Sequence, residues 1–374
     1  MIRRLLALLF VFACAPAEPR GGGEIVIGEY SSLSGSEATF GQSTHNGILL
    51  AVEEINAAGG LHGRKVRLVT EDDQSKPEEA ANAVTKLISA DDVLAVIGEV
   101  ASSSSLAAAP ICQASKVPMI TPASTNPRVT QAGDYIFRMC FVDSYQGPIV
   151  ARYLAQEMGI TRAAMLTDVR SDYSRGLAEA FEQTFTSLGG TIVGRQSYAK
   201  GDSDYRAQLT AIKQTRPEIV FVPGYYNDVA PVAVQARDLG LTVPLVGGDG
   251  WESPKLLEIG GKALEGCMYA NHYHVDDPAP AVREFVTKYE KRYGARPDSL
   301  AALAYDSMRV LADAIRRAGP QFDRAKVRDM LAATRDFPVV TGTITFGENR
   351  NPVGKRIVID EIRDGKIVLR KAFS

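Results

Sequence analysis

The chain has 374 residues, a formal net charge of −2, and 45% hydrophobic and 23% charged residues. This length is typical of two domains, and the composition excludes a chain that is disordered throughout. The absence of a basic excess argues against nucleic-acid binding. With only four cysteines and four histidines, the sequence predicts neither a disulfide scaffold nor a metal centre or other cofactor.

The N-terminus has the features of an export signal. Two arginines precede the apolar residues 5–13, a run too short to span a bilayer. The run ends in the letters VFAC, which resemble a bacterial lipoprotein cleavage site at Cys14. We therefore expect a signal peptide over residues 1–13, then a lipidated Cys14 and a flexible tether over residues 14–23. Ordinary secretory cleavage at an Ala-x-Ala site is the alternative, and both interpretations place the protein in the periplasm or cell envelope.

From residue 24 onward, short β-branched runs alternate with segments of helical period. This alternation predicts parallel sheets with helices on both faces. The alternation of strands and helices starts again near residue 162. This indicates two similar α/β halves, with a ligand site between them at the ends of their strands. The clearest predicted strands are 24–30, 65–71, 93–98, 162–168, 191–199 and 218–223, and the clearest helices are 44–58, 102–115, 174–188, 229–239, 280–293 and 298–318.

Enzyme motifs are absent from the sequence. It contains neither the phosphate-binding G-x-x-x-x-G-K-[ST] nor the nucleophile motif G-x-S-x-G. His272 and His274 would lie on one face of a strand as a conceivable metal pair, but no third ligand is near them. Cys112 and Cys140 either pair in an oxidising compartment or remain buried thiols.

Polar residues follow several predicted strands. Ser102–Ser105 begin a helix, where a hydroxyl either caps the helix or helps its free N–H groups to bind an anion. Residues 121–127 follow the next strand and are also rich in donors. In the second half, Asp249 lies between glycines, and Tyr173 and Tyr225 are placed to wall a pocket. Together these residues predict an anion site on one half and a cation site on the other.

The chain resembles the leucine/isoleucine/valine-binding family, the type I periplasmic solute-binding proteins of ABC importers. The resemblance extends from Glu24 to the C-terminus. It rests on modest motifs that occur in the family's order: Ser32-Leu33-Ser34-Gly35, residues 51–60 (AVEEINAAGG), Val96-Ile97-Gly98, the serines from Ser102, residues 121–127, Phe137-Arg138, Gln146-Gly147 and residues 247–250.

The resemblance implies an amino-acid clamp. Ser102 and Thr125 match hydroxyls that bind the ligand α-carboxylate, together with backbone N–H groups. Ala123 matches a position whose carbonyl accepts from the α-ammonium, and Asp249 matches an acid, often Glu, that pairs with it. Asp143 matches an acid near the first crossover between the domains.

The same resemblance implies the walls of the pocket. Tyr173 and Tyr225 match second-domain tyrosines that close over the ligand. Phe40 matches a first-domain aromatic residue, and Val100 and Ala101 match a pocket wall. We expect Trp251 to join this apolar wall, so the ligand side chain should be apolar too.

The family's fold implies two Rossmann-like three-layer domains joined by a three-stranded hinge. Residues 24–142 and 273–349 would form domain 1, and residues 143–272 and 350–374 would form domain 2. The hinge crossings are therefore expected near Val142, Tyr273 and Asn349.

The function implied by the resemblance is that of a substrate-binding subunit, not an enzyme. It would capture a branched-chain amino acid as a monomer and deliver it to the membrane permease subunits of an ABC importer. Two alternatives keep the fold: another small ligand, such as an aromatic acid, an amide or urea, or a role as a ligand sensor.

Overall fold

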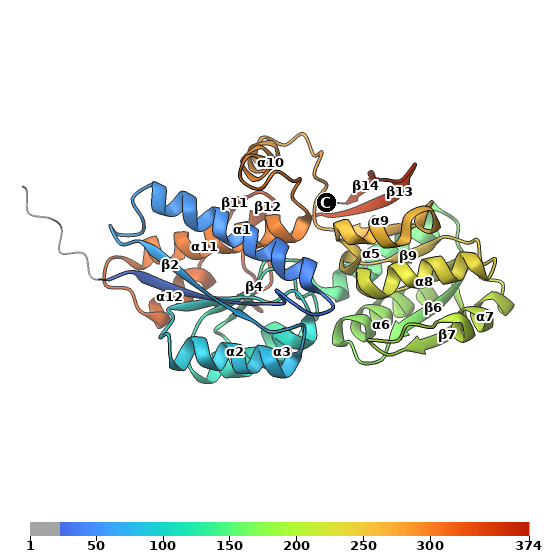
Figure 1. The fold of residues 1–374 in the computed structure, drawn as a ribbon, viewed down its shortest axis with the longest axis horizontal. Coiled ribbons are helices and arrows are strands. Elements are labelled where there is room, and N and C mark those ends of the chain that lie inside the picture. The colour runs from blue at the N-terminus through green and yellow to red at the C-terminus, as the bar shows by residue number, and fades with distance from the viewer. Residues whose placement is uncertain (1–22, 374) are drawn as a thin grey trace, which may run out of the picture.

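The structure, a computed structural model, describes residues 23–373 of the chain. These residues form two lobes that lie side by side, each built around its own β-sheet (Figure 1). The predicted α/β fold with two mainly parallel sheets is confirmed. The expected signal peptide and Cys14 lie outside the described residues.

The first lobe contains a five-stranded parallel sheet in the order β2-β1-β3-β4-β5. Every residue of β3, β4 and β5 is buried, as expected for a parallel sheet covered on both faces. The strands are β1 (Ile25–Ser31), β2 (Val66–Asp72), β3 (Ala95–Ile97), β4 (Met119–Thr121) and β5 (Ile136–Arg138).

Helices from both ends of the chain cover this sheet (Figure 1). α2 and α3 share a core with one face, where Val84 and Cys112 pack with Val96. On the other side α1 lies against α11, so closely that a Cβ on Gly47 would lie 2.1 Å from the carbonyl oxygen of Ala301. The elements of this lobe besides the sheet are α1 (Ala38–Ala57), α2 (Pro77–Ser89), α3 (Ser102–Ala114), α4 (Arg128–Gln131), α10 (Pro280–Tyr293), α11 (Ser299–Ala318), α12 (Arg324–Ala332), β11 (Phe337–Val339) and β12 (Gly342–Ile344).

The second lobe contains a seven-stranded sheet in the order β14-β13-β10-β9-β8-β6-β7. Its strands pair in parallel from β10 to β7, whereas β13 and β14 are antiparallel. The strands are β6 (Arg162–Asp168), β7 (Thr191–Tyr198), β8 (Ile219–Phe221), β9 (Leu245–Gly247), β10 (Met268–Asn271), β13 (Ile357–Arg363) and β14 (Lys366–Phe373). The helices are α5 (Asp143–Arg152), the π-helix η1 (Tyr153–Glu157), α6 (Asp172–Ser187), α7 (Arg206–Gln214), α8 (Tyr226–Asp238), η2 (Asp249–Trp251), α9 (Pro254–Gly260) and η3 (Gly261–Leu264).

The chain passes between the lobes at three places. The first crossing connects β5 to α5, the second connects β10 to α10, and the third connects β12 to β13. Each lobe is therefore assembled from segments that are far apart in the sequence.

The third crossing lies later in the chain than the sequence indicates. The prediction places it near Asn349, but the side-chain oxygen of Asn351 accepts a hydrogen bond from Nε of Arg138 at 2.7 Å in the first lobe. The N–H of Val353 donates to the carbonyl of Thr345 at 2.9 Å. These contacts hold the segment on the first lobe, so the crossing lies between Val353 and β13.

The three cysteines within residues 23–373 are buried and free. A disulfide between Cys112 and Cys140 is therefore wrong, and the alternative of buried thiols is confirmed. Burial raises the pKa of both thiols to about 12, which keeps them protonated. Within the same residues, no helix is long and apolar enough to cross a membrane.

Candidate ligand-binding site

The predicted site residues lie in the loops and first helical turns that follow strands of both sheets, and all of them are buried. Tyr225 is the most exposed of the ten, at 8%. Contacts across the gap between the lobes show that the two sets of loops meet. The ten residues are Phe40, Val100, Ala101, Ser102, Ala123, Thr125, Asp143, Tyr173, Tyr225 and Asp249.

Aromatic side chains connect the lobes. The ring of Tyr225 stacks on that of Tyr173 with centroids 5.1 Å apart and planes 7° apart. Phe40 of α1, in the first lobe, meets the Tyr225 ring edge-on at 5.4 Å. Burial raises the pKa of both tyrosines well above the usual value, so both keep their hydroxyl protons as hydrogen-bond donors.

Asp249 is a buried carboxylate held by one side chain on α5 and one in the second crossing. Nε2 of Gln146, on α5, donates to Oδ1 of Asp249 at 2.8 Å. Nε2 of His272, directly after β10, lies 3.0 Å from Oδ2. Because each carboxylate oxygen has a second lone pair, both can still accept from a ligand.

The glycines around Asp249 permit this close packing. A Cβ on Gly248 would lie 2.3 Å from Oε1 of Gln146, and a Cβ on Gly250 would lie 2.8 Å from the Tyr225 ring. The N–H of Gly250 donates to the hydroxyl of Tyr173 at 3.0 Å. The glycine-rich sequence thus brings backbone, carboxylate and tyrosine rings within contact distance.

Ser102 is the first residue of α3, and its hydroxyl does not cap this helix. Instead it accepts a hydrogen bond from the backbone N–H of Asn126 at 3.2 Å, which ties the loops after β3 and β4 together. The first N–H groups of a helix lack intrahelical partners and attract anions. The first lobe thus presents donors toward the gap.

Two neighbouring side chains have buried oxygen atoms that find no hydrogen-bond partner within the described residues, 23–373. These atoms are Oγ1 of Thr125 and both carboxylate oxygens of Asp143. The two residues are adjacent, because the N–H of Asp143 donates to the carbonyl of Thr125 at 2.9 Å. Buried polar groups are normally hydrogen-bonded, so this corner of the site is incomplete without a donor.

Burial and, after it, the negative charge of the nearby Asp249 raise the pKa of Asp143 to about 8, while the positive charge of Arg138 acts in the opposite direction. Asp143 is therefore largely protonated at neutral pH in the ligand-free chain.

Polar contacts join the two lobes at the rim of the gap. Nζ of Lys200 lies 2.7 Å from a carboxylate oxygen of Glu37 and donates to the carbonyl of Ser75 at 2.9 Å. On another side, the hydroxyl of Ser103 donates to the Asp172 carboxylate at 3.0 Å. These contacts describe a closed arrangement of the lobes.

The structure corrects two expectations. Trp251 does not line the gap: its Nε1 donates to the carbonyl of Val222 at 2.9 Å, and its ring packs on Tyr269 inside the second lobe. His272 and His274 do not lie within a strand, because β10 ends at Asn271. No group of three or more potential metal ligands occurs within residues 23–373.

The sequence did not reveal that Gln146 and His272 hold Asp249. In the sequence, Gln146 stands out only as part of a family motif, and His272 only as a conceivable metal ligand. Their partner lies 103 and 23 residues away in the chain, so only the folded arrangement shows the contacts.

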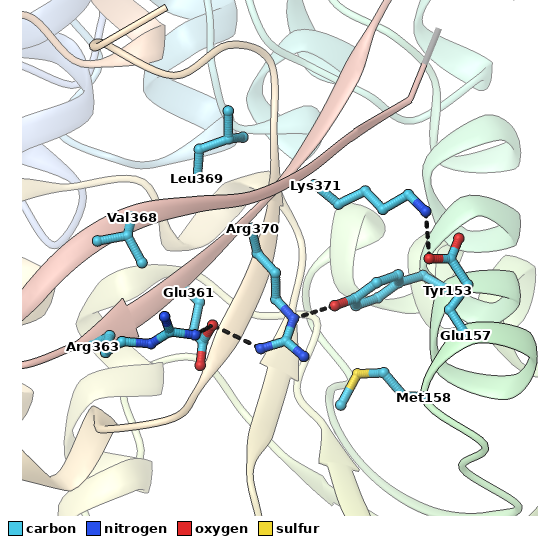
Figure 2. A pocket seen from close by; sticks show the side chains of 9 residues that line it. All are labelled: Tyr153, Glu157, Met158, Glu361, Arg363, Val368, Leu369, Arg370 and Lys371. Atoms are coloured by element: carbon cyan, nitrogen blue, oxygen red, sulfur yellow. Dashed lines mark hydrogen bonds and ion pairs between the residues drawn. The ribbon is translucent and has the colours of Figure 1, made fainter.

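A separate concavity of about 480 Å³ lies between η1 and the β13–β14 hairpin (Figure 2). Its charged side chains pair with one another: Glu361 pairs with Arg363 and Arg370, and Glu157 pairs with Lys371. None of the predicted site residues lines it. The gap between the lobes therefore remains the candidate site.

Comparison with known proteins places the chain in a family. A family model described as periplasmic binding protein matches residues 24–366, so the chain belongs to the periplasmic binding protein family. This is a family of solute-binding proteins that act outside the cytoplasm.

Individual relatives cover nearly the whole chain. The Leu/Ile/Val-binding protein BraC3 of Rhizobium johnstonii is 29% identical over 94% of this chain and 95% of its own length. The crystal structure of a leucine-binding protein, LivK, from Thermotoga maritima is 40% identical over 94% of this chain and 99% of that one, with a TM-score of 0.90. A solute-binding protein of an ABC transporter from R. palustris, in complex with benzoate, has the same fold at 23% identity and a TM-score of 0.86, over 94% of this chain and 96% of that one.

The buried Asp143 leads to a prediction about stability and pH. Its pKa is higher in the folded chain than in the unfolded one, so the folded state binds the extra proton. The wild type should therefore lose stability relative to Asp143→Asn as the pH rises from about 4 to about 8, and the difference should stay constant above that. Urea unfolding of the ligand-free proteins at pH 5, 6.5 and 8 measures this.

The exposed Asp238 provides a matched control, since Asp238→Asn should follow the wild-type pH profile. Parallel profiles for wild type and Asp143→Asn would contradict the assignment of a protonated, buried Asp143.

Proposed function

We propose that this chain is the substrate-binding subunit of an ABC importer and that it captures a branched-chain or similar aliphatic amino acid between its two lobes. The observation that carries the proposal is the separation of charge in the gap. Helix donors and hydroxyls lie on the first lobe, and the buried carboxylate Asp249 lies opposite them on the second, with Asp143 at the first crossing.

In this proposal the ligand α-carboxylate binds at the start of α3. The N–H groups there and the hydroxyls of Ser102 and Thr125 supply its donors. The unpartnered Oγ1 of Thr125 supports this role, since it is buried without another bond. Charge-assisted hydrogen bonds of this kind offset the cost of removing the carboxylate from water.

The α-ammonium binds between Asp249 and Asp143, with the carbonyl of Ala123 as a third acceptor. Asp249 keeps a free lone pair on each oxygen, and Asp143 has no other donor. Three acceptors match the three N–H donors of an ammonium group.

The ligand side chain contacts Phe40, Val100, Ala101 and Tyr225. These residues offer apolar carbon surface, so an aliphatic side chain is buried there without leaving a polar group unpaired. An aromatic acid or another carboxylate without an ammonium group would bring no donor for Asp143 or for the free lone pairs of Asp249. This disfavours that alternative, although a protein of the same fold binds benzoate.

Ligand binding and closure of the lobes are linked. Only the closed arrangement offers both sets of contacts to one ligand, so the ligand shifts the population toward closure. Hinge closure is an established property of periplasmic binding proteins. We propose that domain 1 and domain 2 meet at the three crossings, and that the closed monomer is the form that the permease subunits recognise.

Removing the Asp249 carboxylate tests the clamp. Asp249→Ala should weaken binding of L-leucine by about 2 to 5 kcal/mol, because the ammonium is then buried without its strongest partner. Isothermal titration calorimetry measures this, and Asp238→Ala, an exposed site on the same lobe, should bind as the wild type does. Unchanged leucine affinity in Asp249→Ala would contradict the assignment.

We also propose that Cys14 is lipidated after removal of residues 1–13 and tethers the protein to a membrane. Expressed with its own leader in a bacterium, the chain should appear in the membrane fraction with the mass of acyl groups on an N-terminal Cys14. Cys14→Ser should remain uncleaved or unacylated. An unacylated mature chain that begins after Ala17 would exclude the lipid anchor.

A further inference from the structure

His272 has a contact that the metal hypothesis did not anticipate. The imidazole is fully buried, with Nε2 lying 3.0 Å from Oδ2 of Asp249. Its ring stacks on Phe141, with centroids 4.0 Å apart and planes 25° apart. Phe141 belongs to the first crossing and His272 to the second, so the stacked pair joins two of the segments that connect the lobes.

The contact fixes the tautomer of the imidazole. An ionised carboxylate only accepts hydrogen bonds, so Nε2 must carry the proton that it donates to Asp249. Within residues 23–373, Nδ1 of His272 has no hydrogen-bond partner. A proton on Nδ1 would place a positive charge and an unpaired donor in the interior, which costs more than an unpaired lone pair. The imidazole is accordingly neutral, and burial lowers its pKa from the usual value.

Together with Gln146, this contact leaves Asp249 little rotational freedom. Each carboxylate oxygen accepts from a different side chain, one on α5 and one in the second crossing. Oε1 of Gln146 also accepts from the backbone N–H of Asp249 at 3.2 Å, so the amide group of Gln146 is itself fixed. The orientation of the carboxylate is therefore set by α5 and the second crossing together.

We propose that His272 is a positioning residue for ligand recognition: by donating one hydrogen bond to Asp249 from the second crossing, it aims the carboxylate at the ligand ammonium and so confers selectivity for amino acids over the corresponding simple acids. This inference rests on the proposed function, because it takes Asp249 as the partner of the ammonium. It assigns His272 no contact with the ligand.

The stacking on Phe141 would by itself give His272 a purely structural role. Two variants distinguish this role from that of the hydrogen bond to Asp249. His272→Met removes the ring and the donor but keeps similar volume. His272→Gln also removes the ring, but its Nε2 amide can restore the donor to Asp249. Both lose the aromatic stack, so a difference between them reports the hydrogen bond alone.

The experiment measures the affinities of wild type, His272→Met and His272→Gln for L-leucine and for 4-methylpentanoate, which has the same carbon skeleton without the ammonium. His272→Met should bind leucine about 10- to 100-fold more weakly, the range expected for a lost hydrogen bond to a charged group. Its affinity for 4-methylpentanoate should stay within about threefold of the wild-type value, and His272→Gln should recover most of the leucine affinity.

Equal losses of binding affinity in both variants and for both ligands would overturn the inference in favour of a structural role for the ring. Leucine affinity unchanged in His272→Met, with the wild type binding leucine, would overturn the inference and leave the proposed function intact. If the wild type bound no amino acid, the proposed function would fail and the inference would fail with it.

Discussion

A buried carboxylate without a fixed cation is the constraint on which the rest of the site depends. Asp249 lies in the interior with two neutral donors, Gln146 and His272, and no positively charged side chain among residues 23–373 is bonded to it. Burial of an ionised group is costly unless it is paired. The chain thus holds a negative charge ready for a cation that arrives from outside, and the close packing at Gly248 and Gly250 keeps this charge in place.

The same requirement explains why the site is divided between two lobes. A zwitterion has opposite charges only a few ångströms apart, so one lobe can present donors while the other presents the acceptor. Polar contacts at the rim, Lys200 with Glu37 and Asp172 with Ser103, exist only when the lobes meet. They add to the closed state without determining which ligand it holds, since none of them involves the residues assigned to the ligand.

Much of the fold follows from local sequence signals. The alternation of β-branched runs and helical periods predicts parallel sheets, because strand and helix patterns depend on neighbours within a few residues. The place of the third crossing does not follow in this way. It is set by the bond from Arg138 to Asn351, which are 213 residues apart, and such pairings have no local signal.

The candidate site shows the same limit. Asp249 stands out between glycines in the sequence, and in the structure the adjacent Gly250 lies against Tyr173 and Tyr225. Trp251 is wrong as a pocket wall because the indole finds a carbonyl partner inside the second lobe. The contacts of His272 are visible only in the folded chain, where the end of β10 lies against Asp249 and Phe141.

The most direct test of the proposed site compares L-leucine with two analogues, each of which lacks one of its two charged groups. Calorimetric titration of the ligand-free chain with L-leucine, 4-methylpentanoate and 3-methylbutylamine separates the contributions of the carboxylate and the ammonium. Leucine should bind at least about 30-fold more tightly than either analogue, since each analogue leaves the binding groups for its missing charge unsatisfied. Binding of 4-methylpentanoate or benzoate as tight as that of leucine would contradict the central claim that the gap is built for an amino-acid zwitterion.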